Sequence, residues 1–387
     1  MSQNPRNVSF LKNSNRASVL ESIRRGPISR IDISRQTELT KPTVTVLTNE
    51  MIVEGLLYEV GPSKRSNAGR GRTSVLLDIV PDFAYAVGIS LHRRNIHISI
   101  VNLKMEQIAG EKRATALFSS PDMAIEWCVE TVKKLFFNMG VSFKKCVGIG
   151  ISSPGSLNYE KGIILEPLLF SLFHHYPVVK KIKDYFDCPV FLENNSVSLA
   201  LADFYMRGGG LGNSLFVVVS DGIGSTLLQD GTVFRGAHGF AGELGHVSVE
   251  TQGKPCICGN VGCLEMYATL GALMSKFGIG SYEKTVDRAL NGDETSNEVL
   301  QYLAECFGKA FVIAINLFDL NNIVLFGEYA YHAELLTELI QKYINNHSLI
   351  CKIHPVSVVP SKLLFQDMSI SAAVSALNYF FEHNSNK

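Results

Sequence analysis

One short stretch limits what this chain can fold into more than any other. Residues 242–265, GELGHVSVETQGKPCICGNVGCLE, hold one histidine and three cysteines among glycines and a proline, with an acidic residue near each end. The chain has eight cysteines, and the other five are scattered singly along it. Scattered cysteines do not form the framework of a secreted disulfide protein, so the local cluster favours a metal site in a reducing compartment.

The candidate ligands are His246, Cys256, Cys258 and Cys263. One imidazole and three thiolates form a Cys₃His set, the closed tetrahedral kind that structural zinc prefers, and it leaves no position for a catalytic water. A chance cluster of small buried thiols is the alternative. We therefore predict a structural zinc ion, whose loop also anchors Glu243 and Glu265 near one place.

Length and hydropathy limit the rest of the molecule. With 46% hydrophobic and 19% charged positions, 387 residues are enough for two or three domains with sizeable cores. The N-terminal stretch has no continuous apolar segment, and no later stretch approaches the roughly 20 apolar residues of a membrane span. We therefore expect a globular protein in the cytoplasm, with no membrane partner.

Charge is distributed unevenly, although the chain as a whole has 36 basic and 36 acidic residues. Residues 1–80 hold 12 basic and 7 acidic side chains, a net charge of +5, whereas residues 81–387 hold 24 and 29, a net charge of −5. A basic head on an acidic body favours a polyanionic partner for the head alone.

The apolar residues of the head recur at helical spacing and predict three short helices. Gly26 and Pro27 end the first helix, Ser29 can cap the second, and Thr40 can cap the third. This order is typical of a helix-turn-helix, in which the third helix reads DNA. If the apolar residues of the third helix face inward, its outer face and N-terminal end carry Lys41, Thr43, Thr45 and Thr48.

Two β-like runs follow, around a glycine-rich loop that carries Lys64, Arg65, Arg70 and Arg72. This pattern is typical of a wing, and Arg70 and Arg72 at its tip suit contact with phosphates or insertion into a minor groove. A small protein-interaction domain with a solvated basic loop is the alternative. We predict that residues 1–80 form a winged helix-turn-helix domain that binds double-stranded DNA.

From Phe83 onward, β-branched runs alternate with longer helical stretches. Strands are expected within 85–91, 95–103, 144–155, 188–195 and 214–224, and helices near 262–277 and 295–318. The alternation predicts an α/β body of sheets covered by helices. Two parts of this body look alike, each with a strand-rich start and a glycine turn, near Gly88 and near Gly222. We therefore expect two related lobes with a cleft between them.

The motifs GIGISSPG, ENN, SDGIG, GELGH and CICGNVGCLE follow the predicted winged helix-turn-helix in this order. The combination resembles the ROK family of repressors, open reading frames and sugar kinases, over nearly the whole chain. The resemblance implies that residues 81–387 form a two-lobed, actin-like ATPase body of the sugar-kinase type. One lobe would span about 81–195 with the C-terminal helix, and the other about 196–370. The likeness also implies a homodimer or homotetramer.

The same resemblance places a sugar beside the predicted metal loop. It implies that Glu243, Glu265 and His246 contact the sugar, His246 with the ring nitrogen that does not bind metal. Asn194 and Asn195 of the ENN motif would face the same sugar. Amides and carboxylates suit a polyol because they donate to or accept from adjacent hydroxyls. The alternative for any one of these residues is a solvated surface side chain.

Departures from the kinase pattern bear on catalysis. Kinases of the family carry an Asp-x-Gly-x-Thr turn for phosphate, whereas here Ser90, His92, Arg93 and Arg94 replace the acid and the glycine. Kinases of the family also have Glu-Asn-Asp, whose aspartate takes the proton from the attacking sugar hydroxyl. This chain has Asn195 at that position, and an amide cannot act as this base. The adenosine-side turn has Gly327 and Glu328 in place of two glycines. We expect no kinase activity.

We therefore expect a sugar-responsive, DNA-binding transcriptional repressor that is inactive as a kinase. Sugar would act by binding two conformations unequally and thereby changing how a symmetric oligomer holds its operator. Two alternatives stay open: a bifunctional ATP-dependent sugar kinase that keeps a DNA-binding head, and a DNA-binding regulator controlled by a protein partner. ATP turnover would identify the first, and sugar-titration calorimetry would separate the second.

Overall fold

The computed structural model describes residues 5–62, 74–364 and 367–383, and at the N-terminal end its side chains are described from Phe10 onward. The chain forms two compact units, residues 1–198 with 369–387 and residues 199–368. The backbone passes between them twice, inside helix α6 (Asn195–Met206) and inside helix α12 (Met368–Ser371). The predicted wing tip with Arg70 and Arg72 lies outside the described residues.

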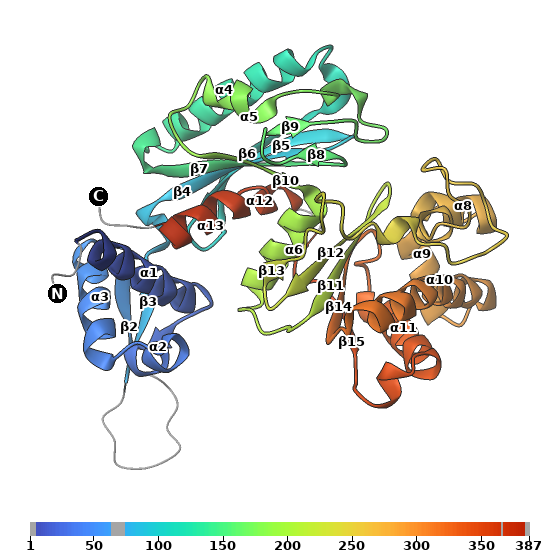
Figure 1. Cartoon of the computed structure of the whole chain (residues 1–387). Coiled ribbons are helices and arrows are strands. Elements are labelled where there is room, and N and C mark those ends of the chain that lie inside the picture. Colours follow the sequence, from blue (N-terminus) through green and yellow to red (C-terminus); the bar gives the residue numbers. More distant parts are fainter. Residues whose placement is uncertain (1–4, 63–73, 365–366, 384–387) are drawn as a thin grey trace. The chain divides into compact units, whose positions relative to one another are not determined.

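The first part of unit 1 contains helices and a small antiparallel sheet with the order β1-β3-β2 (Figure 1). Its elements are α1 (Pro5–Arg24), β1 (Ile28–Ser29), α2 (Arg30–Thr37), α3 (Lys41–Val53), β2 (Leu57–Pro62) and β3 (Val75–Ile79). Ser29 caps α2 by accepting from the Asp32 amide, and Thr40 caps α3 by accepting from the Thr43 amide. The three expected helices, both expected caps and the two strands of the wing are therefore confirmed.

Each of the three helices of this part buries apolar side chains, and ion pairs join these helices. Val19, Ile33 and Val44, one from each helix, are fully buried. The buried Arg16 of α1 pairs with Glu54 at the end of α3. Helix α1 also packs against the C-terminal helix α13 (Val374–His383), where the Arg24 guanidinium lies 4.5 Å from the centre of the Phe381 ring.

The rest of unit 1 is built on a mixed five-stranded sheet with the order β10-β7-β4-β5-β6. Its strands are β4 (Tyr85–Leu91), β5 (Asn95–Asn102), β6 (Gln107–Ala114), β7 (Cys146–Ser153) and β10 (Val190–Asn194). Helices α4 (Pro121–Asn138) and α5 (Val178–Lys183) cover one face, and α13 covers the other (Figure 1). Strands β8 (Leu157–Asn158) and β9 (Ile163–Ile164) form a separate pair. Helical cover on both faces explains why every residue of β4 is buried.

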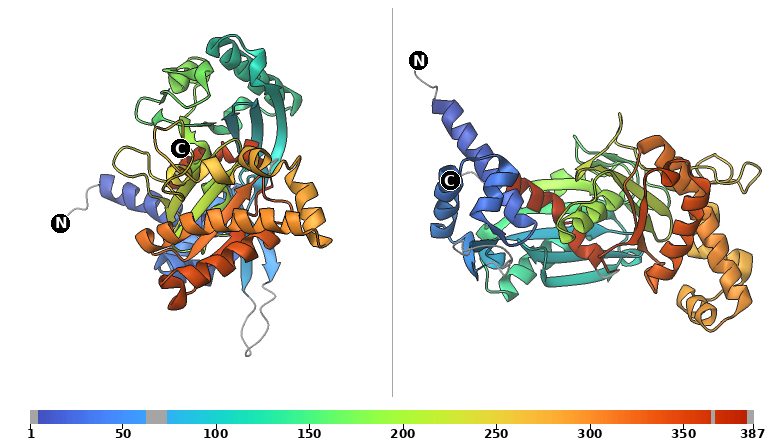
Figure 2. Two further views of the ribbon diagram at one scale, coloured as in Figure 1. Left: turned by 90° about the vertical axis from the view of Figure 1, so that its right-hand side faces the viewer. Right: turned by 90° about the horizontal axis from the view of Figure 1, so that it is seen from below.

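Unit 2 contains a second five-stranded sheet, with the order β13-β12-β11-β14-β15. Its strands are β11 (Ser214–Val219), β12 (Ile223–Gln229), β13 (Thr232–Val233), β14 (Asn322–Gly327) and β15 (Ser357–Pro360). Its helices after α6 are α7 (Glu265–Ala268), α8 (Leu270–Phe277), α9 (Tyr282–Leu290), α10 (Glu294–Phe318) and α11 (Ala333–His347). Helices α10 and α11 lie side by side (Figure 2) and enclose a continuous apolar core with the sheet.

Short 3-10 helices complete the two units. They are η1 (Pro81–Phe83), η2 (Thr115–Leu117), η3 (Phe143–Lys145) and η4 (Ser171–Phe173) in unit 1, and η5 (Leu244–His246) and η6 (Ile350–Lys352) in unit 2.

The two five-stranded sheets share one topology. When the strands of each are numbered along the chain, both have the order 3-2-1-4-5. In both, the first three strands pair antiparallel, and strands 1, 4 and 5 pair parallel. The expected likeness between two parts of the body is therefore present in the strand order, and the expected α/β class is confirmed.

Candidate functional site

Four potential metal ligands come together in unit 2. The ligand atoms of His246, Cys256, Cys258 and Cys263 all lie within 4.8 Å of one another. His246 Nδ1 is 3.6 Å from Cys256 Sγ, and Cys258 Sγ is 3.7 Å from Cys263 Sγ. The four residues expected from the sequence therefore form a group that could hold a metal ion, with Nδ1 as the ring nitrogen nearest the thiols.

Short-range backbone contacts stabilise the conformation of residues 242–265, the metal loop. The turn η5 presents the imidazole, and the Val249 amide donates to the Gly262 carbonyl at 2.9 Å. Gly262 has φ +77°, and a Cβ added there would lie 1.7 Å from the Glu250 carbonyl oxygen. A side chain at this position would push apart the two arms that carry the ligands, so the close approach requires glycine.

The charge of the cluster suits a cation. Burial, together with the neighbouring thiols of Cys258 and Cys256, raises the pKa of Cys263 to about 12. A backbone hydrogen bond at Asn260 is the main cause that lowers the pKa of Cys258. Three thiolates this close would repel one another unless a positive charge lay between them. The donor set therefore fits a metal ion that prefers thiolate and imidazole ligands.

Glu265 lies where the metal loop meets the sheet of unit 2. It is the first residue of α7, and its Oε2 atom accepts from the Ile223 amide at 2.8 Å. A Cβ added at Gly222 would lie 2.5 Å from the same carboxylate oxygen, so this glycine makes room for the acid. The SDGIG turn between β11 and β12 thus holds a carboxylate that is 42 residues distant in sequence.

Glu243 is placed by the strand β12. The Gly242 carbonyl accepts from the Ser225 hydroxyl at 2.7 Å, and Gly242 has φ +98°. The Glu243 side chain retains exposed surface, yet the surrounding protein atoms desolvate its carboxyl and raise its pKa. His246 lowers this pKa and Glu265 raises it. These electrostatic effects indicate that the charged groups of Glu243, Glu265 and His246 lie near one another.

Asn194 and Asn195 belong to unit 1, where β10 passes into α6. The Asn194 side chain is engaged locally, because its Oδ1 accepts from the Ser196 amide at 2.8 Å. Asn195 Nδ2 donates to the Leu91 carbonyl at 3.4 Å, but Asn195 Oδ1 is buried and has no hydrogen-bond partner among the described residues. An unsatisfied buried acceptor costs about 1–3 kcal/mol. Of the pair, Asn195 therefore has an unused acceptor that a ligand hydroxyl could satisfy.

The turn after β4 is occupied by bulky, hydrogen-bonded residues. Ser90 is buried near the end of the strand. The Arg93 guanidinium donates to the Leu168 carbonyl at 2.9 Å, and the His92 carbonyl accepts from the Thr115 hydroxyl at 2.7 Å. The sequence from Ser90 to Arg94 contains no glycine that would let backbone amides approach a phosphate closely.

In the helix-turn-helix, α3 presents most of the side chains expected for contact with DNA. Lys41 and Thr45 are exposed, and Thr43 is half-buried beside the cap. The Thr45 hydroxyl donates to the Lys41 carbonyl at 2.8 Å, and the Thr43 hydroxyl lies 2.8 Å from that of Thr40. These three side chains therefore lie in the first turns of α3, which is the end that enters the major groove in this motif.

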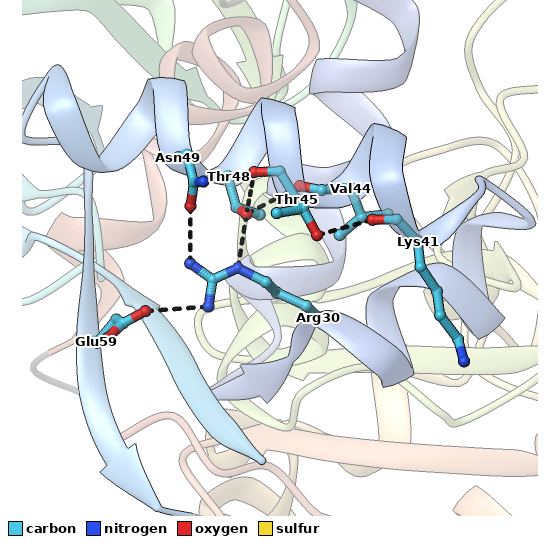
Figure 3. Close-up of polar contacts among 7 residues, drawn as sticks. All are labelled: Arg30, Lys41, Val44, Thr45, Thr48, Asn49 and Glu59. Carbon is cyan, nitrogen blue, oxygen red and sulfur yellow. Dashed lines mark hydrogen bonds and ion pairs between the residues drawn. The ribbon is translucent and has the colours of Figure 1, made fainter.

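Thr48 does not lie on the outer face, so that expectation was wrong. Its side chain is fully buried, and its hydroxyl donates to the Val44 carbonyl at 2.9 Å. Arg30, at the start of α2, donates from Nε to Thr48 Oγ1 at 3.0 Å and from Nη2 to Asn49 Oδ1 at 3.1 Å (Figure 3). Its Nη1 donates to Glu59 Oε1 on β2 at 3.0 Å. One guanidinium therefore joins α2, α3 and the wing and covers Thr48.

Val46 and Asn49 of α3 are exposed but were not predicted from the sequence as candidates for contact with DNA. The Val46 side chain is 57% exposed, and Asn49 is exposed one turn further on. Val46 is out of phase with the buried Val44, Leu47 and Met51, so its exposure could have been inferred from the helical spacing. The contacts of Arg30 have no signal in the sequence, because they join three separate elements.

Comparison with known proteins gives consistent matches along the chain. The model of the ROK family matches residues 86–374. The xylose repressor of Caldicellulosiruptor bescii is 29% identical over 378 residues, covering 92% of this chain and 94% of the repressor. The DNA-binding transcriptional dual regulator NagC of Escherichia coli is 30% identical over 374 residues, covering 92% of this chain and 91% of NagC.

The similar solved structures include both a regulator and a kinase. A ROK family transcriptional regulator, a homolog of the E. coli MLC protein, has a TM-score of 0.76 and 27% identity, covering 96% of this chain and 98% of its own. The ROK hexokinase of Thermus thermophilus has a TM-score of 0.62 and 25% identity, covering 75% of this chain and 97% of its own. Among the described residues, no helix combines the length and the apolarity needed to cross a bilayer.

Proposed function

The chain belongs to the ROK family, and from that membership we propose that it is a sugar-responsive, DNA-binding transcriptional repressor. The observation that carries this proposal is the extent of the similarity to regulators. The repressors and the regulator structure match more than nine-tenths of this chain, whereas the hexokinase matches three-quarters of it. The capped helix-turn-helix with two wing strands supplies the DNA-binding part that a kinase alone does not need.

Residues 1–80 would bind operator DNA, and residues 81–387 would form the sugar-binding body. Lys41, Thr43 and Thr45 at the start of α3 would contact base edges, and the exposed Val46 could pack against a thymine methyl group. Arg70 and Arg72 of the wing would contact phosphates or the minor groove. The net charge of +5 on the head favours this polyanionic partner.

The Cys₃His group would hold a structural zinc ion. Structural zinc prefers a closed set of thiolates and imidazole, and all four candidate ligands come from one short segment of the chain. When bound, zinc would supply positive charge to the three thiolates and keep the loop closed. This chain's own contribution is to hold Glu243, Glu265 and His246 as neighbours on that loop.

A sugar effector would be recognised by Asn194, Asn195, Glu243, His246 and Glu265. Carboxylate and amide oxygens bind adjacent hydroxyls of a polyol with defined geometry. Asn195 Oδ1, which has no hydrogen-bond partner among the described residues, and His246 Nε2, the ring nitrogen that is not paired with Cys256, would contact the sugar hydroxyls. Sugar would then shift the repressor between conformations of different operator affinity, because it binds them unequally.

We further propose that the protein does not phosphorylate its sugar. The amide of Asn195 cannot remove a proton from a hydroxyl at neutral pH, and the turn from Ser90 to Arg94 offers neither an acid nor a glycine for phosphate and Mg²⁺. A bifunctional sugar kinase is the second candidate, because a hexokinase is among the structural relatives. An ATP-coupled assay over common hexoses and pentoses separates the two. ADP release on the order of one per second would establish the kinase.

One experiment tests the proposed function as a whole. Operator fragments are first selected from random duplexes with the full chain, and their release is then measured by fluorescence anisotropy over a panel of monosaccharides. We expect one sugar or a few related sugars to weaken operator binding at least tenfold. Sedimentation of the purified protein should show a homodimer or homotetramer. Cell fractionation should place the protein in the cytoplasm. Selection of no DNA sequence, or release by none of the sugars, would contradict the proposal.

A further inference from the structure

Two cysteines outside the metal cluster lie together in unit 1. Cys146 is the first residue of β7, and Cys188 comes just before β10, the strand that pairs in parallel with β7. Val190 lies opposite Ile149, and the Pro189 carbonyl accepts from the Ile149 amide at 2.9 Å. Continued to the strand ends, this register puts the two cysteines one position apart on neighbouring strands. Val147 is an extra residue in β7 relative to β4, and this irregularity beside Cys146 lets both side chains fall on the same face of the sheet.

This offset is compatible with a disulfide bond. Neighbouring strands are about 4.8 Å apart and rise about 3.3 Å per residue, so a one-residue offset separates the two Cα atoms by roughly 6 Å. Disulfides bridge Cα separations of about 4.4–6.8 Å. Both side chains pack against the same apolar core of unit 1, so they lie on one face of the sheet, and each thiol shifts the pKa of the other. The strands therefore need little rearrangement to be joined.

We propose that Cys146 and Cys188 are a site of reversible oxidation, at which a hydroperoxide converts the two thiols into an intramolecular disulfide.

The surroundings of the pair allow the oxidant to reach one sulfur first. Cys188 lines a surface depression of about 710 Å³ formed by Lys183 to Pro189, and its side chain is half-exposed. The hydrogen bond from Cys146 and, less strongly, the charge of Lys183 lower the pKa of Cys188, against the opposing effects of burial and Asp187. The thiolate is the reactive form of cysteine. Cys188 is therefore the sulfur that attacks.

Cys146 has the properties of the second sulfur. The same hydrogen bond, together with burial, raises its pKa, so it stays protonated while Cys188 reacts. Its sulfur lies 3.4 Å from the Gly148 carbonyl oxygen, which places it beside the strand end. A thiol held next to a reactive cysteine is placed to resolve its oxidised form.

The chemistry balances with hydrogen peroxide as the oxidant. The Cys188 sulfur attacks one peroxide oxygen, the O–O bond breaks, and the leaving hydroxide takes a proton to become water. The sulfenic acid on Cys188 is then attacked by the Cys146 sulfur. The S–O bond breaks, the S–S bond forms, and hydroxide leaves as a second water with the Cys146 proton. The two sulfurs lose two electrons to the peroxide, and a thiol reductant returns them by exchange.

Other cysteines outside the metal loop lack this combination. Cys128 is fully buried, and burial raises its pKa. Cys306 is buried as well, and burial raises its pKa to about 11. Cys351 is half-buried, like the proposed pair, but belongs to unit 2. It therefore provides a matched control.

The test uses the full chain, reduced and with its metal retained. The protein is treated with hydrogen peroxide, quenched with an alkylating agent and digested without reduction. We expect a cross-linked peptide pair that contains Cys146 and Cys188 and disappears after treatment with dithiothreitol. Cys188→Ser should abolish the cross-link, whereas Cys351→Ser should leave its yield unchanged. Oxidation confined to the metal-loop cysteines, or an equal loss of the cross-link in Cys351→Ser, would overturn the proposal.

A second variant covers the case in which Cys188→Ser does not fold. In Cys146→Ser the sulfenic acid on Cys188 has no resolving thiol, so a sulfenic-acid reagent such as dimedone should label Cys188 several-fold more than in the wild type. Absence of this label would show that Cys188 does not react with peroxide and would also overturn the proposal. Thermal unfolding gives a further readout, because a disulfide that closes this loop should raise the melting temperature of the wild type.

Discussion

The candidate metal loop and helix α3, the proposed reading helix, both present side chains to which we assign a function, but they are held in different ways. The ligands of the metal loop lie between His246 and Cys263 and are placed by contacts within the same stretch. Helix α3 is held by Arg30, 18 residues before Thr48, and by Arg16, 38 residues before Glu54. The position of a tight loop therefore follows from its local sequence, whereas the rotation of a helix depends on side chains from other elements.

The largest effect is expected from opening the metal loop. Cys258→Ser removes one ligand of the proposed zinc, so it should lower the free energy of unfolding by about 3 kcal/mol or more. It should also weaken the sugar response, because the loop that carries His246 between Glu243 and Glu265 loses the ion that would keep it closed. Thermal unfolding and elemental analysis measure both changes, with Cys351→Ser as the control. Wild-type protein purified without chelator and found free of zinc would contradict the assignment.

Glu243→Ala should remove sugar binding while the loop stays folded. The lost carboxylate would bind two hydroxyls at about 1.5 kcal/mol each, which corresponds to roughly a hundredfold rise in the sugar Kd. Operator affinity without sugar should be unchanged, so the variant should stay on its operator when sugar is added. Glu250→Ala, an exposed acid of the same loop, is the control. Equal losses in both variants would argue against a specific role for Glu243.

Arg30→Gln tests whether α3 depends on its distant contacts. The variant breaks the ion pair with Glu59 and the hydrogen bonds to Thr48 and Asn49. Helix α3 should then no longer keep one orientation about its own axis relative to α2 and β2. We expect about a tenfold loss of operator affinity, with a smaller ratio of operator to non-operator binding. Arg35→Gln on the same helix breaks an exposed pair with Asp32 and serves as the control. An equal loss on all DNA sequences would identify Arg30 as a phosphate contact instead.

The wing arginines should have a smaller and less specific effect. Arg70→Ala or Arg72→Ala removes a contact with the backbone or the minor groove, so each should weaken binding several-fold on many sequences and reduce the salt slope by about one. Titrations at several salt concentrations measure this change. Arg25→Ala, which affects an ion pair with Glu21 on α1, is the control. An unchanged salt slope would place the wing away from DNA.

The smallest effect is expected from Asn195→Asp. The substitution restores a possible base, but the turn from Ser90 to Arg94 still lacks the residues that position phosphate and Mg²⁺. Turnover of ATP should therefore stay near background in a coupled assay with the effector sugar. Activity on the order of one per second in this variant would show that the turn was not the limiting defect.

Much of the fold could be predicted because the relevant signals are local. The strand expected at 85–91 has those bounds, and the helix expected at 295–318 begins one residue earlier. The caps Ser29 and Thr40 follow from the side-chain chemistry of helix ends. Thr48 could not be placed correctly, because a small polar residue at a helical position gives no sign that an arginine from another helix will cover it.

The order of residues alone was sufficient to predict the α/β class, the helix-turn-helix and the convergence of the four potential metal ligands. In each case the hydrophobic spacing, the caps and the ligand spacing act over fewer than about 20 residues. Three features were decided only by the tertiary structure. They are the meeting of Glu265 with the SDGIG turn, the buried Asn195 Oδ1 that has no partner among the described residues, and the packing of Cys146 and Cys188 on one core. They depend on strand order and register, which bring distant segments together and leave no local mark in the sequence.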